Sequence, residues 1–179
     1  MVKNLRLETK NLIVRPYTKE DAKNLYDTLN DENILKYIPE EPISMEQAQN
    51  AIDWLISNYD IDLDSDYKYS FAIEAKETND YVGWCGFGYL DYDKSQKEIY
   101  FTLKSKYWGQ GLATEASKTL IDYIFNELEL KKLVAVVKPE NRASQKVIEK
   151  LGFEYEGVVE NLPEEFSFYE GERYYTLKG

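Results

Sequence analysis

Two glycines, Gly109 and Gly111, mark the stretch of the chain where backbone groups could bind an anion. The surrounding segment Tyr107–Ala116 reads YWGQGLATEA and lies between a β-rich segment and a long helical pattern. Such a strand–loop–helix junction leaves amide N–H groups unpaired at the positive end of a helix dipole, which suits a phosphate or pyrophosphate. Glycine lets that phosphate approach the backbone closely. An ordinary tight turn would also use two glycines, so the spacing alone leaves both interpretations open.

The residue types that the chain lacks narrow its chemistry. It has no histidine, which excludes Ser-His-Asp and Cys-His catalysis, zinc sites that use histidine and a histidine general base. Cys85 is the only cysteine, so no intrachain disulfide forms, and its apolar surroundings favour a buried thiol. The acidic run 60–66 does not complete a calcium loop, because Ser65 and Phe71 occupy the positions that need Gly and Glu. We therefore expect no metal, and proton transfer by carboxylate, Tyr, Ser, Lys or water.

Size and charge limit the class of protein. A chain of 179 residues with 43% apolar content predicts a single domain over residues 1–179. The formal net charge of −11 disfavours nucleic-acid binding and fits cationic partners such as amines, although solubility alone would also explain it. No apolar run reaches the roughly 20 residues of a membrane span, and no secretion signal is visible at the N-terminus. We expect a cytoplasmic protein with no membrane partner.

The elements that would position the glycine loop alternate in type along the chain. An extended segment, Leu5–Pro16, comes first. Further strands are predicted at 69–74, 81–90, 98–103 and 133–137, with a closing pair at 153–159 and 173–177. Helices are predicted after Thr18, after Ser44, over 112–128 and after Asn141. The fold class is therefore α+β: a mixed, mostly antiparallel sheet of about six to seven strands, about four helices, and one strand–helix–strand crossover.

Two motifs occur in order and make a resemblance specific. The first motif, WGQGLATEA, covers 108–116, and the second, PENRASQKVIEKLGFEYEG, covers 139–157. The opening segment ETKNLIVRPYTKED adds a third stretch to the same resemblance. Together they resemble the GNAT N-acetyltransferase superfamily, and most closely its RimJ/RimL-like branch of ribosomal-protein-alanine acetyltransferases. The resemblance spans nearly the whole chain. It implies a GNAT-like fold and transfer of an acetyl group from acetyl-CoA to a primary amine.

The resemblance also implies where acetyl-CoA binds. The family's phosphate-loop pattern falls on 108–113, and Trp108 departs from its Arg or Gln, a small loss for a loop that binds through backbone N–H groups. The amides implied for the pyrophosphate are those of Gly109, Gln110, Gly111, Leu112, Ala113 and Thr114. The backbone implied for the pantetheine arm is that of Phe101, Thr102 and Leu103. Lys104 and Lys106 either add positive charge for the phosphates or are ordinary exposed residues.

The second motif carries two further candidates. Asn141 matches a family position that contacts the cofactor arm or orders the following helix, and a local N-cap would explain it equally well. Many relatives have a tyrosine seven residues later that protonates the leaving thiolate, but here Ile148 occupies that position. In the RimL-like branch a serine three residues after the asparagine can take this role. Ser144 is that serine, or only a residue of the first helical turn.

The implied mechanism is direct attack of a primary amine on the thioester through a tetrahedral intermediate. A main-chain N–H near Leu103 would stabilise the oxyanion, and Glu98 would accept the amine's proton, with water as a relay. A strand-edge salt bridge would also explain Glu98. Aromatic residues that either wall an acceptor pocket or pack in the core are Trp54, Trp84, Tyr89 and Tyr169.

Three alternatives stay open for the function. The acceptor is a protein N-terminal amine or a small-molecule amine. Instead of an enzyme, the chain could also be an acyl-CoA-binding sensor or interaction module with little or no catalysis. A homodimer is also left open, because the sequence does not set the oligomeric state.

Overall fold

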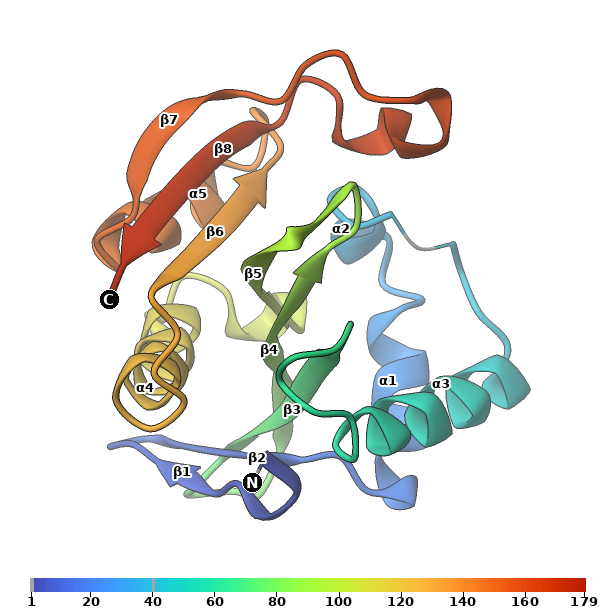
Figure 1. Cartoon of the computed structure of the whole chain (residues 1–179). Helices are drawn as coiled ribbons and strands as arrows, with labels where there is room; N and C mark the ends of the chain where they lie inside the picture. Colours follow the sequence, from blue (N-terminus) through green and yellow to red (C-terminus); the bar gives the residue numbers. More distant parts are fainter. Residues whose placement is uncertain (1, 40) are drawn as a thin grey trace.

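One mixed sheet runs through the molecule (Figure 1). The computed structural model describes residues 2–39 and 41–179, and in them eight strands lie in the order β1-β2-β3-β4-β5-β6-β8-β7. The strands are β1 Leu7–Glu8, β2 Leu12–Pro16, β3 Lys68–Ala75, β4 Tyr81–Leu90, β5 Asp93–Leu103, β6 Lys132–Val137, β7 Glu154–Val158 and β8 Arg173–Lys178. Only β5 and β6 pair in parallel, and all other neighbours are antiparallel. The predicted α+β class and its crossover are confirmed.

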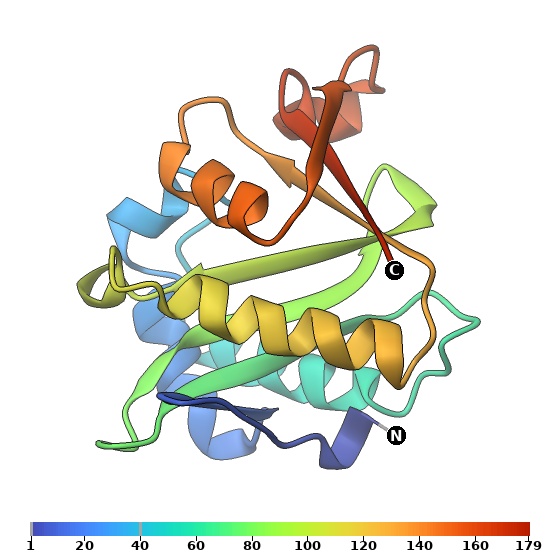
Figure 2. The same cartoon turned by 90° about the vertical axis from the view of Figure 1, so that its left-hand side faces the viewer.

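Helices cover both faces of the sheet. They are α1 Ala22–Thr28, α2 Glu32–Leu35, α3 Met45–Asn58, α4 Leu112–Asn126 and α5 Arg142–Lys150. In Figure 2 α4 crosses in front of the strands while α1 and α3 lie behind them, and α4 contacts β2, β4 and β5. The crossover β5–α4–β6 therefore places the start of α4 beside the end of β5, where the glycine loop lies.

The structure has one strand more than the upper predicted number. The extended segment 5–16 was predicted as a single strand, but it folds back as the β1–β2 hairpin. Glu115 of α4 holds the turn by accepting hydrogen bonds from the Asn11 amide N–H at 2.8 Å and from the Thr9 hydroxyl. Because this partner is more than 100 residues away in the chain, local β-propensity gives no sign of the turn. The one-turn helix α2 is likewise an addition, capped by the side chain of Asp31.

Helix ends follow the predicted capping signals. Ser44 accepts a hydrogen bond from the Gln47 amide at 3.1 Å while Gln47 accepts one from the Ser44 amide at 2.7 Å, which is a complete capping box. Thr18 and Asp21 form a second box before α1. Gly152, with φ +91°, follows the end of α5, where a left-handed residue commonly ends a helix. These local signals account for the start of α3, for the turn that leads into α1 and for the end of α5.

The core lies on both faces of β4 and β5. The register Cys85↔Phe101 and Phe87↔Ile99 directs these side chains toward α4. Cys85 is fully buried, so the predicted buried thiol is confirmed, and burial raises the pKa of this thiol well above its usual value. The opposite face packs Tyr81 against α1 and α3. No helix in the described ranges is both long and apolar enough to cross a membrane.

Glycines in β4 make room for side chains from the neighbouring strands. A Cβ at Gly86 would lie 2.5 Å from the ring of Tyr100, and one at Gly88 would lie 2.7 Å from the Cα of Lys68. Both glycines therefore serve the close approach of neighbouring strands. Their absent side chains leave space for Tyr100 and Lys68, which both line the candidate site.

Candidate active site

Strands β5 and β6 meet at one point and then separate (Figure 1). Their only registered pair in the described residues is Glu98↔Val134. On the other side of β5, Leu103 lies opposite Gly83, and the next amide, Lys104 N–H, donates to Val82 O at 2.9 Å. In an antiparallel ladder this alternation turns the backbone groups of Leu103, and of Phe101 two residues earlier, away from β4. They face the gap between β5 and β6.

The same alternation separates Thr102 from its neighbours. Its register partner is Trp84, so its own backbone groups are directed at β4. Of the three residues predicted to pair with a pantetheine arm, Phe101 and Leu103 therefore present backbone groups to the gap. The backbone groups of Thr102 face β4 instead.

The glycine loop opens directly into this gap. Gly109 and Gly111 have φ values of +74° and +77°, and a Cβ on either would meet nothing within 4 Å. Gly111 is the N-cap of α4. The amides of Trp108 and Glu115 bond to backbone carbonyls, and in the described chain no such bond is recorded for the six amides between them. The loop therefore combines free N–H donors, open space and a helix N-terminus, which is the arrangement an anion needs.

Trp108 fastens this loop to the strand before it. Its indole N–H donates to Leu103 O at 2.8 Å. Ser105 donates to the carboxylate of Asp31 at 2.8 Å, so the start of α2 is tied to the same turn. Neither contact is indicated by the local sequence, and the Trp108 bond explains how the loop is held although Trp replaces the family's Arg or Gln.

The two lysines near the loop rest against aromatic rings. The Lys104 ammonium lies 5.2 Å from the ring centre of Tyr81, and that of Lys106 lies 4.8 Å from the ring centre of Tyr107. Burial lowers the pKa of Lys104. Neither lysine lines the cavity described next, so their charge reaches the loop only from its edge.

One cavity of about 980 Å³ joins the loop to the rest of the predicted site. It is lined by these predicted residues: Glu98, Phe101, Thr102, Leu103, Gly109, Gly111, Leu112, Ala113, Thr114, Asn141 and Ser144. Gln110 is not among them, and its side chain donates to Lys106 O at 3.0 Å. The four aromatic residues considered for an acceptor wall, Trp54, Trp84, Tyr89 and Tyr169, line the cavity too. Its volume is that of a site for a large ligand.

The end of the cavity away from the loop carries charged groups, of which Glu98 is buried and Lys68 and Asp91 are half-buried. Lys68 lies 2.7 Å from Asp91 Oδ1 and 3.3 Å from Glu98 Oε1, and Tyr169 donates its hydroxyl proton to Asp91. Burial opposes the charge on Lys68, but Glu98 and Asp91 outweigh it and raise the pKa of this lysine. Glu98 thus makes the salt bridge that the sequence left as one interpretation, and it also lines the cavity, as a catalytic carboxylate must.

Glu172 is a second buried carboxylate of the cavity, and sequence reasoning missed it. It immediately precedes β8, and its side chain is only 5% exposed and lies 4.0 Å from the ammonium of Lys138. Burial raises the pKa of Glu172 to about 7, with Lys138 opposing the rise and Glu98 and Glu140 adding to it. A glutamate between a turn and a strand carries no sequence pattern, so only the packing reveals it.

The second motif lies at the rim of the cavity. Asn141 Oδ1 accepts a hydrogen bond from the Ser144 amide at 3.1 Å, which confirms the N-cap interpretation. Both side chains line the cavity, so contact with a cofactor stays a prediction for Asn141, as does thiolate protonation for Ser144. Ile148 is 1% exposed within the core and brings no hydroxyl.

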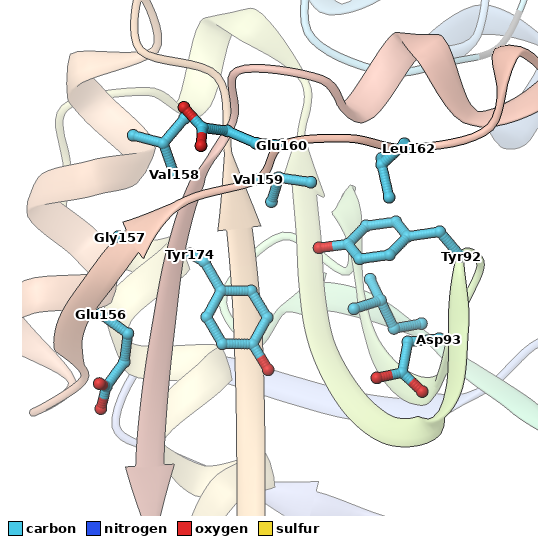
Figure 3. Close-up of a pocket in the computed structure, with 10 residues that line it drawn as sticks. Tyr92, Asp93, Glu156, Gly157, Val158, Val159, Glu160, Leu162 and Tyr174 are labelled. Atoms are coloured by element: carbon cyan, nitrogen blue, oxygen red, sulfur yellow. The ribbon is translucent and has the colours of Figure 1, made fainter.

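A separate hollow of about 290 Å³ lies between the β4–β5 turn and strands β7 and β8. Figure 3 shows the Tyr92 ring lying across it, close to Val159 and Leu162. It contains none of the predicted site residues. In the described part of the chain, no group of three or more Cys, Asp or Glu side chains could hold a metal ion.

Comparison with known proteins agrees with this geometry. The model of the Acetyltransferase (GNAT) domain matches residues 11–154. An uncharacterized N-acetyltransferase p20 from Bacillus licheniformis is 35% identical over 154 residues, covering 86% of this chain and 84% of that protein.

Two solved structures share the fold. A putative ribosomal-protein-serine acetyltransferase from Vibrio cholerae has a TM-score of 0.80 at 21% identity and full coverage of both chains. A spermidine N-acetyltransferase from Vibrio cholerae, solved in complex with CoA and spermine, has a TM-score of 0.75 at 22% identity, covering 95% of this chain and 96% of that one. The chain therefore belongs to the GNAT acetyltransferase family, and it is an enzyme that transfers an acetyl group from acetyl-CoA to an amine.

Proposed function

We propose that the acceptor is a primary amine, either a protein N-terminus or a small-molecule amine, which enters the cavity from its aromatic and acidic side. The observation that carries this is the continuity of the cavity. It runs from the free amides of the glycine loop, along the unpaired edge of β5, to the carboxylates around Lys68. An ammonium is attracted by such carboxylates, and aromatic walls such as Trp54 and Trp84 suit a cation.

Acetyl-CoA supplies the acetyl thioester. The residues of the loop suit its pyrophosphate, and those of the strand suit its pantetheine arm. Amides over 109–114, including that of Gln110, would bind the pyrophosphate, because their donors are free and no Cβ blocks the approach at the two glycines. The backbone groups of Phe101 and Leu103 would pair with the pantetheine arm as an added strand pairs with a sheet edge. Asn141, at the rim of the same cavity, would contact that arm.

Two side chains have chemical roles in this proposal. Glu98 contacts the acceptor ammonium and begins the removal of its proton through water, since it lies in the cavity on the same strand as Phe101 and Leu103. Ser144 protonates the leaving thiolate from the first turn of α5. The Leu103 N–H, which is turned toward the gap, would stabilise the oxyanion that develops on the thioester carbonyl.

The RimJ/RimL-like assignment belongs to the same proposal. The two motifs and the opening segment support it, and the fold is shared with a putative ribosomal-protein acetyltransferase. The fold is shared also with an acetyltransferase of spermidine, so a small polycationic amine is the second acceptor class.

An amine panel tests the proposal directly. We would measure thiol release from acetyl-CoA with peptides bearing N-terminal alanine or serine, with spermidine, and with the N-terminally acetylated peptides as controls. Peptide turnover with no spermidine turnover would support the RimJ/RimL-like assignment, and the reverse would overturn it. No thiol release with any amine would overturn the proposed acceptor class as a whole.

The same assay tests the two side chains. Glu98→Gln should lower turnover about 100-fold or more, as expected for loss of an acid–base group. Ser144→Ala should lower it to a smaller extent, because water can protonate a thiolate. Near-normal turnover of either variant would remove that residue from the mechanism.

A further inference from the structure

Two carboxylates face the cavity from opposite sides of the gap between β5 and β6. Glu98 lies on β5 at the point where the two strands part. Glu172 lies on the far side, because the pairing Val137↔Arg173 places it beside the end of β6. Both are buried, with residue exposures of 7% for Glu98 and 4% for Glu172, and both line the same cavity.

The two carboxylates differ in the distance to their nearest lysine ammonium. The Lys68 ammonium is held by Glu98 and Asp91 together, at 3.3 Å and 2.7 Å. The Lys138 ammonium lies 4.0 Å from Glu172, while it sits 3.7 Å from the ring centre of Phe168 and 3.4 Å from Phe168 O. Glu98 therefore has a cation within salt-bridge distance, whereas the cation nearest Glu172 lies at the limit of an ion pair.

We propose that Glu172 is the proton acceptor of the acetyl transfer, receiving through water the proton that the acceptor ammonium gives up beside Glu98. This inference rests on the proposed function and deepens it. Glu98, beside Lys68, attracts and orients the ammonium and directs its proton into water, while Glu172 stores the proton until it passes to solvent.

The electrostatic surroundings of Glu172 suit such a role. The groups that act on its charge come from three elements: Lys138 at the end of β6, Glu140 in the turn before α5, and Glu98 on β5. Glu172 acts in turn on the phenol of Tyr92 from the β4–β5 turn. Burial and the two glutamates outweigh Lys138 and bring the pKa of Glu172 to about 7. A base with this pKa is unprotonated half the time at neutral pH, which is the condition for efficient proton transfer.

The proton balance of the reaction is simple. The ammonium R–NH₃⁺ loses one proton to Glu172 and becomes a neutral amine, whose lone pair forms the N–C bond to the acetyl carbonyl carbon. The C–S bond breaks with its electron pair on sulfur. The thiolate gains one proton from Ser144 in the proposal above, and the second proton that the nitrogen loses as the amide forms passes through water to restore the Ser144 hydroxyl. Glu172 then releases its proton to solvent, so the net products are the amide, CoA thiol and one proton.

A titration of the protein without substrates tests the carboxylate itself. With ¹³C-carboxyl-labelled glutamate, the wild-type spectrum should contain one resonance that titrates near pH 7, and Glu172→Gln should lack it. Glu149→Gln, an exposed change on α5 outside the cavity, should keep it. A wild-type protein in which every glutamate titrates below pH 6 would overturn the proposal without reference to any acceptor.

The pH profile of kcat/KM tests the role in catalysis. The acceptor should be an alkyl amine whose ammonium has a pKa of about 10, as that of lysine does. Its own ionisation then stays outside the pH range of the expected break. Wild-type and Glu149→Gln profiles should rise through about pH 7 to a plateau. Glu172→Gln should lose the break near pH 7 and about 100-fold of the plateau rate. Glu172→Asp should restore the break and part of the rate.

The outcomes separate the two proposals. Wild-type protein that acetylates no amine overturns the proposed function. Active wild-type protein whose break near pH 7 persists in Glu172→Gln overturns only the role of Glu172. Acetyl-CoA affinity within twofold of wild type shows that the variant is folded. If Glu172→Gln does not fold, the profile of Glu172→Asp and the wild-type titration decide the question.

Discussion

The glycine loop and the acidic end of the cavity are built in opposite ways. The loop is made by consecutive residues from Trp108 to Thr114, and it offers backbone N–H groups and open space. The acidic end brings Lys68 of β3, Asp91 of the β4–β5 turn, Glu98 of β5 and Glu172 before β8 into one place. The loop can be recognised from a short motif, whereas the acidic end exists only when four separate segments are packed.

The two regions also differ in how they tolerate change. Backbone donors survive most side-chain substitutions, so we expect the loop to bind its anion with Trp108 in the place of Arg or Gln. Buried charges depend on each partner, because removal of one leaves another without compensation in a medium of low polarity. We therefore expect changes at the acidic end to affect stability and its pH dependence, and changes at the loop to affect acetyl-CoA binding.

The largest effect is expected from Lys68→Met. It removes the cation shared by Glu98 and Asp91, so the free energy of unfolding at pH 7 should fall by about 3 to 5 kcal/mol. Denaturant unfolding measures this, with Lys106→Met beside the glycine loop as the control, which should lose less than about 1 kcal/mol. Equal losses in the two variants would contradict the contrast between the regions.

Glu172→Gln should change the pH dependence of stability. A carboxyl whose pKa rises from 4.5 to about 7 on folding stabilises the protein fully below pH 4.5, and this contribution is lost as the pH rises through about 7. The variant lacks the titration, so it should match wild type at pH 4.5 and exceed it by about 3 kcal/mol at pH 8. Unfolding curves at several pH values measure the difference. For Glu149→Gln, the difference in free energy of unfolding from wild type should be the same at every pH. The same constant difference for Glu172→Gln would refute the prediction.

Gly111→Ala should act mainly on ligand binding. At φ +77° an alanine costs about 1 to 2 kcal/mol of stability, and its Cβ enters the space left open for a phosphate. The acetyl-CoA dissociation constant should rise roughly 10- to 100-fold, a loss of about 1.4 to 2.8 kcal/mol.

Gly152→Ala is the matched control for that change. Its φ of +91° imposes a similar strain outside the cavity, so calorimetry should show lost stability with unchanged acetyl-CoA affinity. Equal affinity losses at the two glycines would mean that strain, and not the loop, governs binding.

The smallest effect is expected from Trp108→Phe. It deletes the indole N–H that donates to Leu103 O while keeping an aromatic ring, and a single hydrogen bond contributes about 1 kcal/mol. Acetyl-CoA affinity should fall about fivefold because the loop is no longer fixed to β5. Trp54→Phe alters a similarly exposed indole on the acceptor side, so titration should find its acetyl-CoA affinity unchanged.

Much of the fold was predictable because its signals are local. The helix starts after Thr18, Ser44 and Asn141 follow from caps within three residues, and β4 was predicted with the bounds that it has. The β1–β2 turn was missed because its anchor is Glu115, far along the chain. Its hydrogen bonds leave no trace in the sequence around 9–11.

The candidate site likewise contains residues that the sequence could predict and residues that it could not. The loop residues could be named from motif and spacing, and Glu98 from its place on the strand. Glu172, Lys68 and the bond between Trp108 and Leu103 could not, because each depends on a partner from another element.

The sequence by itself determined the family motif, the absence of histidine chemistry and the alternation of elements, since periodicity and backbone conformation are properties of neighbouring residues. Only the tertiary structure decided which carboxylates share a cavity and which cation each one meets. Those facts depend on burial and distance between segments, and burial is what moves the pKa of Glu172 toward neutrality.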